Sequence, residues 1–253
     1  MIDQRTKKPL VVTIVHHDSR YPALGSAACV AHAESKLDTA TFDFSPRFVE
    51  NHSEIDAVLA EPGHHILLFG NYLWSRDRNL QLSAHAKAVD RDVLTIHGGP
   101  STPSRPDELR QFLDAHPHID FAVFGEGENT FVEILRTLPH NNPSPRPKIE
   151  GCAYRFKEQV IVGPPRARSA DLSEFASPYL TGRFPREVIA KWEAAILESN
   201  RGCPYGCTFC DWGSATMQKI RRFPMDRVQN EIEWIAKHQM PSIVTANTRC
   251  QTS

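Results

Sequence analysis

The chain has 253 residues, 40% hydrophobic and 23% charged, with a formal net charge of −1. This composition is typical of a globular protein with a buried core, and the balanced charge gives no indication of a nucleic-acid-binding face. No stretch approaches the roughly 20 apolar residues that a membrane-spanning helix requires, and the amino-terminal apolar run is too short for a signal peptide. With only six cysteines and no export signal, we expect a protein of the reducing cytoplasm rather than a disulfide framework.

The first half of the chain alternates apolar runs with helical periodicity. Five short runs are predicted as buried strands, at residues 10–15, 39–44, 65–70, 93–97 and 121–124. Apolar side chains at i, i+3, i+4 and i+7 predict helices between and after them, as at Leu109, Phe112 and Leu113, and then at Phe131, Ile134, Leu135 and Leu138. The alternation predicts an α/β fold, a doubly wound parallel sheet of Rossmann or flavodoxin-like type, over residues 1–140.

Doubly wound sheets bind ligands at the carboxyl ends of their strands, and two predicted loops there are rich in glycine. HGGPSTP at 97–103 follows the fourth strand, and FGEGENTF at 124–131 follows the fifth. Glycine lets a ligand approach the backbone because it has no Cβ. A purely structural reading stays open, since glycines also form tight turns and acidic residues favour helix N-termini.

A segment rich in Pro and Asn, LPHNNPSPRPKIEG at 138–151, predicts a surface linker and a domain boundary. Residues 151–162 then predict a small hairpin, on which Cys152 is expected to be a packed residue. We therefore divide the chain into a first domain at 1–140, a linker and hairpin connector at 141–193, and a second domain that starts at 194.

The second domain carries the strongest motif, RGCPYGCTFC at 201–210, in which Cys203, Cys207 and Cys210 form a CxxxCxxC triplet. Three thiolates on one loop can hold a 4Fe-4S cluster and leave one iron open to a small molecule. A zinc site would need a fourth ligand, and Cys250, His238 and Cys152 show no paired zinc spacing.

The residues around the triplet predict one strand and one helix. Residues 194–202 indicate a strand that leads into the loop, and 219–235 indicate the helix that follows it. Val228, Ile232 and Ile235 would share a helical face, with Pro224 near the start of the helix. A strand, a metal loop and a helix form the first unit of a β/α barrel.

The triplet, with Phe209 just before its third cysteine, resembles the cluster loop of the radical S-adenosylmethionine (SAM) enzymes. The resemblance implies that Cys203, Cys207 and Cys210 bind a 4Fe-4S cluster, that SAM chelates the fourth iron, and that the backbone near Phe209 lies against the adenine. The reduced cluster would cleave SAM to a 5'-deoxyadenosyl radical, with electrons from a donor such as flavodoxin or ferredoxin.

The first domain, taken with this triplet, resembles the cobalamin-binding domain that precedes the cluster domain in one radical SAM subgroup. By position, the resemblance places several residues beside the corrin ring: Gly98, Gly99, Gly125, Glu126, Gly127 and Glu128, and more weakly Gly70. The DxHxxG motif of other cobalamin proteins is absent, because the chain reads HHDSRYPALG after its first strand. The resemblance therefore does not extend to a histidine ligand for cobalt.

The carboxyl end predicts an incomplete barrel. Six βα units of roughly 30 residues each need about 180 residues, far more than follow the triplet. The second barrel strand is expected near 242–246, without the acidic segment that usually helps to bind SAM there. We expect a truncated chain whose first domain folds alone. The substrate pocket would lie mostly in the missing part of the barrel.

The function that these features predict is that of a cobalamin-dependent radical SAM enzyme acting on a small molecule, with methyl transfer to an unreactive carbon as the leading reaction. Two alternatives stay open. One is a non-catalytic cobalamin-binding module from a truncated gene, and the other is a zinc-stabilised binding protein.

Overall fold

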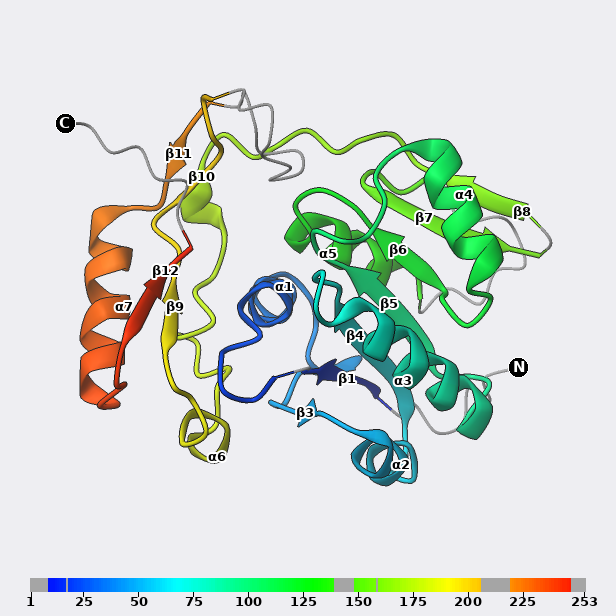
Figure 1. Cartoon of the computed structure of the whole chain (residues 1–253), viewed down its shortest axis with the longest axis horizontal. Helices are drawn as coiled ribbons and strands as arrows, with labels where there is room; N and C mark the ends of the chain where they lie inside the picture. The colour runs from blue at the N-terminus through cyan, green and yellow to red at the C-terminus, as the bar shows by residue number, and fades with distance from the viewer. Residues whose placement is uncertain (1–8, 17, 139–147, 158, 206–218, 247–253) are drawn as a thin grey trace.

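The computed structural model describes residues 9–16, 18–138, 148–157, 159–205 and 219–246. Within these residues the chain forms an α/β structure around an eight-stranded sheet (Figure 1). Four parallel strands make its centre, in the order β1, β4, β5, β6: Leu10–Val15, His64–Gly70, Leu94–Gly98 and Phe121–Val123. The chain leaves β1 first toward one edge and then returns to its other side as β4, so the strand order reverses between β1 and β4.

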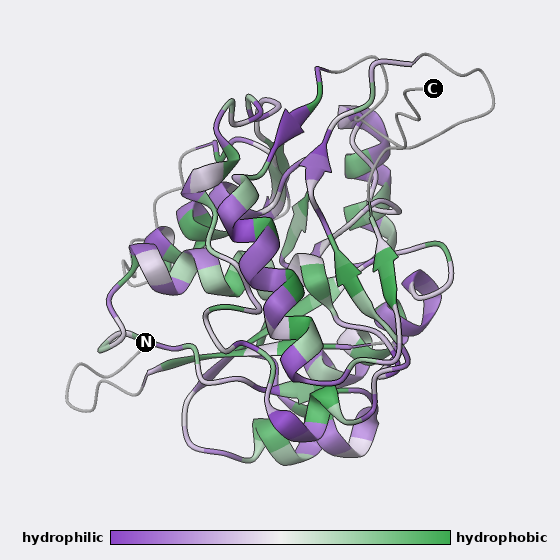
Figure 2. Ribbon diagram, turned by 90° about the vertical axis from the view of Figure 1, so that its left-hand side faces the viewer, coloured by the Kyte–Doolittle hydropathy of each residue, from purple (hydrophilic) through white to green (hydrophobic). Residues whose placement is uncertain are grey.

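Helices cover both faces of the sheet (Figure 1). One face carries α1 and α5, and the other carries α2, α3 and α4; their bounds are Leu24–Lys36, Glu128–Thr137, His52–Leu59, Arg76–Val89 and Pro106–Ala115. Successive side chains of β4 pack on opposite faces of the sheet. Ile66 belongs to the core under α1 and α5, and Leu67 belongs to the core under α2 and α3. Burial on both faces explains why the central strands are mostly apolar. In Figure 2 the hydrophobic residues, in green, gather toward the middle of the structure, and the helices at its surface carry hydrophilic residues, in purple.

The second predicted strand is wrong in its extent. Residues 39–44 contribute only β2, Phe42–Asp43, and a second short strand, β3, follows at Phe48–Val49; both pair in parallel with β1. The Asp43 carboxylate accepts a hydrogen bond from the Ser45 backbone N–H at 2.9 Å and pairs with Arg47 at 2.9 Å. This side-chain turn interrupts the strand.

The predicted hairpin is present as β7, Cys152–Phe156, and β8, Gln159–Val162. It does more than connect two regions, because β7 pairs antiparallel with β6 and extends the main sheet. Cys152 is fully buried on β7, as expected.

The second half begins with a short 3-10 turn at Leu172–Glu174 and helix α6 at Arg186–Ile189. Strand β9, Ala195–Leu197, then pairs in parallel with β12, Ile243–Thr245, and α7, Met225–Lys237, lies between them in sequence. Strands β10, Asn200–Arg201, and β11, Arg221–Arg222, form a separate antiparallel pair. None of the helices in the described part of the chain is long and apolar enough to cross a membrane.

Helix α7 buries two of the three residues predicted for its inward face. Val228 and Ile235 are buried, but Ile232 is 41% exposed and Glu231 takes the inward position. Burial of Glu231 is tolerated because Arg227 binds its carboxylate at 3.0 Å. The hydrophobic period therefore identified the helix and two of its buried residues, but it was wrong for Ile232, since Glu231 is buried in its place.

Candidate functional site

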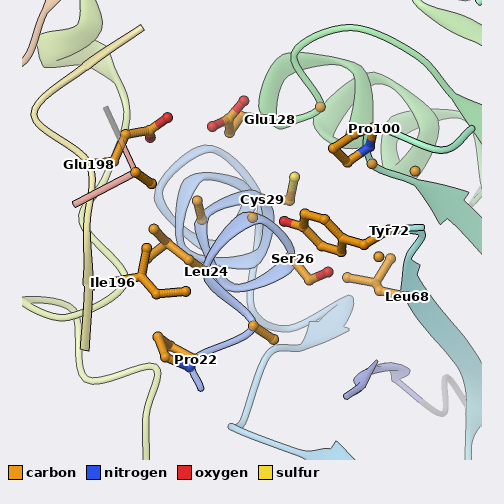
Figure 3. Close-up of a pocket in the computed structure, with 18 of the residues that line it drawn as sticks. Pro22, Leu24, Ser26, Cys29, Leu68, Tyr72, Pro100, Glu128, Ile196 and Glu198 are labelled. Carbon is orange, nitrogen blue, oxygen red and sulfur yellow. The ribbon is translucent and has the colours of Figure 1, made fainter. Parts of the chain in front are cut away.

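A cavity of about 970 Å³ opens at the carboxyl ends of the central strands, beside the point where the strand order reverses. Its wall continues across α1 to the β9 and β10 region. In Figure 3, Ile196 and Glu198 stand on one side of α1, and Tyr72 and Pro100 stand on the other. Residues distant in the sequence thus enclose one space.

The residues that the sequence assigned to a corrin site come together on this cavity. Gly70, Gly98, Gly99, Gly125, Glu126, Gly127 and Glu128 all line it. They come from the ends of three neighbouring strands, β4, β5 and β6. Their placement agrees with the loop positions predicted, and their role as cofactor contacts stays a prediction.

Backbone contacts hold the β4 and β5 loops against each other. The Asn71 N–H donates to the Gly98 carbonyl at 2.6 Å, and the Asn71 carbonyl accepts from Ser101 N–H at 3.0 Å. The Asn71 side chain is fully buried and lies 3.2 Å from Nδ1 of His97. Burial, together with the nearby His118 and His116, holds the pKa of His97 well below its usual value, so that the ring is neutral.

One end of the cavity carries a buried charge cluster. Arg201 Nη2 donates to Glu128 at 2.6 Å and to Glu198 at 2.9 Å. Burial opposes ionisation of Glu128, but the charge and hydrogen bond of Arg201 outweigh it and hold the pKa of Glu128 below its usual value. Burial raises the pKa of Glu198 by more than Arg201 lowers it. Of the two carboxyl groups bound to Arg201, Glu198 is therefore the one that more readily takes a proton.

The wall between the charged end and the strand ends holds two weakly acidic groups, Cys29 and Tyr72. Burial raises the pKa of both, so the thiol and the phenol stay protonated. Trp74 stacks on Tyr72 with ring centroids 5.2 Å apart and also lines the cavity. The wall is mostly neutral and suits a large organic ligand.

Two histidines in or next to strands of the main sheet are buried. His16 ends the β1 region, is 2% exposed and lines the cavity, and His65 is buried within β4.

Of the predicted cluster ligands, the structure places Cys203, while Cys207, Phe209 and Cys210 lie outside the described residues. Cys203 is half-buried and directly follows Gly202, which lines the cavity. Of the other ligands considered for zinc, Cys152 is buried on β7, His238 Nδ1 lies 2.7 Å from the Trp234 carbonyl, and Cys250 is outside the described residues. No group of three metal-binding side chains occurs among the described residues.

The chain resembles known proteins in both sequence and structure. It is 35% identical over 235 residues to the cobalamin-dependent radical SAM methyltransferase TokK of Streptomyces tokunonensis, covering 89% of this chain and 34% of that protein. It is also 35% identical over 211 residues to the 2-(S-pantetheinyl)-carbapenam-3-carboxylate methyltransferase of Streptantibioticus cattleyicolor, covering 81% of this chain and 30% of that protein. No protein-family model matches the chain.

This chain belongs to the cobalamin-dependent radical SAM family. It spans about a third of the length of the curated relatives that it matches. The radical SAM methyltransferase TsrM of Kitasatospora setae, solved with tryptophan and a SAM analogue, has a similar fold, with a TM-score of 0.64 at 14% identity. That likeness covers 95% of this chain and 48% of TsrM and confirms the α/β fold class.

The sequence gave no indication of the charged residues next to the predicted cluster loop. Arg201 and Glu198 line the cavity, and Arg221 pairs with Glu126 beside it. In the sequence, Arg201 is marked only as the first residue of the cysteine motif RGCPYGCTFC. One of its two acidic partners, Glu128, lies 73 residues earlier in the chain, and sequence spacing gives no signal for such a contact.

Proposed function

We propose that this chain binds cobalamin, a 4Fe-4S cluster and SAM, and contributes to methyl transfer onto an unreactive carbon of a small molecule. The observation that carries the proposal is the cavity itself. Its walls combine the glycine-rich strand ends of the first half with Gly202, the residue before Cys203. A cofactor seated on the strand ends would thus lie beside the loop that carries the cysteines.

The residues present fit a corrin ring. A flat macrocycle needs close approach to the backbone, and Gly70, Gly98, Gly99, Gly125 and Gly127 provide a wall without side chains. A volume of about 970 Å³ lies at the upper end of the roughly 300–1,000 Å³ typical of ligand pockets. When bound, cobalamin would supply a methyl-carrying cobalt.

The chain's own residues would contribute positioning and exclusion of water. The glycine loops would hold the ring, and the thiolates of Cys203, Cys207 and Cys210 would hold the cluster. The protonated Cys29 and Tyr72 add no charge to the wall. An electron donor such as flavodoxin or ferredoxin is part of the proposal, as is a location in the reducing cytoplasm.

The test is electron paramagnetic resonance of the anaerobically reconstituted, dithionite-reduced chain with and without SAM, with iron, sulfide, zinc and bound cobalamin counted on the same sample. We expect a cluster signal that shifts when SAM is added. Cys203→Ala should lose it, and Cys152→Ala, which alters a buried cysteine of the sheet, should keep it.

Other outcomes separate the alternatives. Bound cobalamin with no SAM-sensitive cluster would support a non-catalytic cobalamin-binding module. About one zinc per chain, with neither iron nor sulfide, would indicate a structural metal site. Either result would overturn the proposed function.

A further inference from the structure

Strands β10 and β11 lie on either side of Cys203, Cys207 and Cys210 in the sequence, and together they form a two-stranded ribbon, here called the neck. Strands β10 and β11 are antiparallel, and Arg201 and Arg221 are direct cross-strand partners. Cross-strand partners project from the same face of a ribbon, and like charges placed there repel each other. A neck with two opposed arginines therefore needs compensating charge from outside the ribbon.

Part of that charge comes from Glu198, three residues before Arg201, and the rest comes from the GEGE segment that follows β6. Glu128 binds Arg201 at 2.6 Å, and both carboxylate oxygens of Glu126 bind Arg221, one of them at 3.1 Å. The acids are two residues apart, and each takes one of the two opposed arginines. The pairing joins elements 73 and 95 residues apart in the sequence.

The side chains of these two ion pairs are largely buried, which restricts their movement. The side chains of Arg201 and Arg221 are 15% and 10% exposed, and that of Glu128 is 5% exposed. Arg201 also lies between two rings, with its guanidinium 5.3 Å from the centroid of Phe175 and 5.4 Å from that of Phe223. Shielded, hydrogen-bonded pairs of this kind are stronger and more rigid than ion pairs on an open surface.

We propose that Glu126 and Glu128 are positioning residues that clamp the neck of the cysteine loop, through Arg221 and Arg201, to the loop after β6 on the cavity wall. The clamp sets how the cysteine segment is held relative to the cavity. The ion pairs themselves need neither cofactor. Their consequence, a fixed spacing between cluster and cobalamin, rests on the proposed function. It gives the two acids a role toward the protein and not toward the corrin ring.

The test is hydrogen–deuterium exchange on the full chain without cofactors, comparing Arg221→Gln with its exposed neighbour Arg222→Gln. We expect backbone amides at 200–202 and 221–222 to exchange about tenfold faster in Arg221→Gln and in Glu126→Gln, because the neck opens locally at lower cost. Arg222→Gln, and Glu133→Gln on helix α5, which begins two residues after Glu126, should leave them unchanged. Amides of β4 serve as the check that each variant is folded.

Charge reversal distinguishes a clamp from general packing. Glu126→Arg alone should speed exchange at the neck, and the double variant Glu126→Arg with Arg221→Glu should restore it, because the pair is rebuilt with opposite sign. Neck exchange equal in Arg221→Gln and Arg222→Gln, or a double variant as fast as the single one, would overturn the clamp.

In the loaded protein, we expect Arg221→Gln to keep its iron and cobalamin content but to change the magnetic coupling between reduced cluster and cob(II)alamin. Unchanged coupling would overturn the positioning role. A wild-type chain that takes up neither cofactor would instead defeat the proposed function, while the exchange measurement still decides the clamp.

Discussion

Two neighbouring glycines on the cavity wall differ in whether the backbone around them leaves room for a side chain. Gly99 has a φ of +96°, and a Cβ built on it would lie 2.7 Å from the Asn71 carbonyl oxygen and 2.9 Å from the Asn71 nitrogen. Gly98, its neighbour, has room for a Cβ, whose nearest atom would be Val123 Cβ at 3.6 Å. Gly99 is therefore required by the fold, while Gly98 is free to serve the cavity.

Gly99→Ala should lower the free energy of unfolding by about 1–3 kcal/mol, because alanine at this φ is strained and its Cβ meets backbone that cannot easily move. Gly98→Ala should change stability much less and act mainly on cofactor binding. Urea unfolding of both variants, with cobalamin titration of each, measures the difference. Equal loss of stability in the two would show that Gly99 is not the constrained position.

At the scale of elements, the sequence predicted those strands and helices whose burial is uniform. The central strands are apolar on both faces, and their bounds came out within a residue or two. Prediction failed where a polar side chain decided the local structure, as Asp43 does by interrupting the second strand and Glu231 by occupying the inner face of α7. The site glycines were predictable from their loops, whereas the Glu126 and Glu128 contacts depend on tertiary packing.

Both edges of strand β9 are hydrogen-bonded, one of them by a side chain, which the sequence did not reveal. Its Ala195 N–H and Leu197 carbonyl face the β12 segment, and Tyr179 meets the opposite edge. The buried Tyr179 hydroxyl donates to the Ile196 carbonyl at 2.7 Å and accepts from the Ile196 N–H at 3.2 Å. One side chain thus closes the strand edge next to the cavity, where Ile196 is exposed to the ligand space.

Tyr179→Phe should therefore cost about 1–3 kcal/mol, because it leaves a donor and an acceptor of Ile196 without their partner. The signature is local: the Ile196 amide should exchange faster, while the Ala195 amide, bonded to the Ser242 carbonyl at 2.9 Å, should change less. Hydrogen exchange resolved to these two amides tests the prediction. Equal acceleration at both would mean that the whole β9 segment loosens and that the hydroxyl does not cap its edge.

At the scale of the molecule, the cavity depends on both halves of the chain. The first half supplies the strand ends and α1, and the second supplies Ile196, Glu198, Arg201 and Gly202. The β7 and β8 hairpin, by contrast, extends the sheet at its far edge, and none of its described residues lies on the cavity wall. A ligand that fills the cavity should therefore stabilise those segments between residues 70 and 202 that line the cavity. It should not stabilise segments merely because they are close to them in the sequence.

Adding cobalamin to the anaerobic chain should slow amide exchange in three separated stretches, 98–99, 125–128 and 196–202, by a common factor. Binding to the folded state stabilises every segment that must open to release the ligand, and at about 100-fold excess over Kd that stabilisation approaches about 2.7 kcal/mol. Amides of β8 should show less protection, because that hairpin can open without disturbing the cavity. Protection confined to 98–99 and 125–128 would mean that the ligand sits on the first half alone, and that the cavity wall at 196–202 does not take part in holding it.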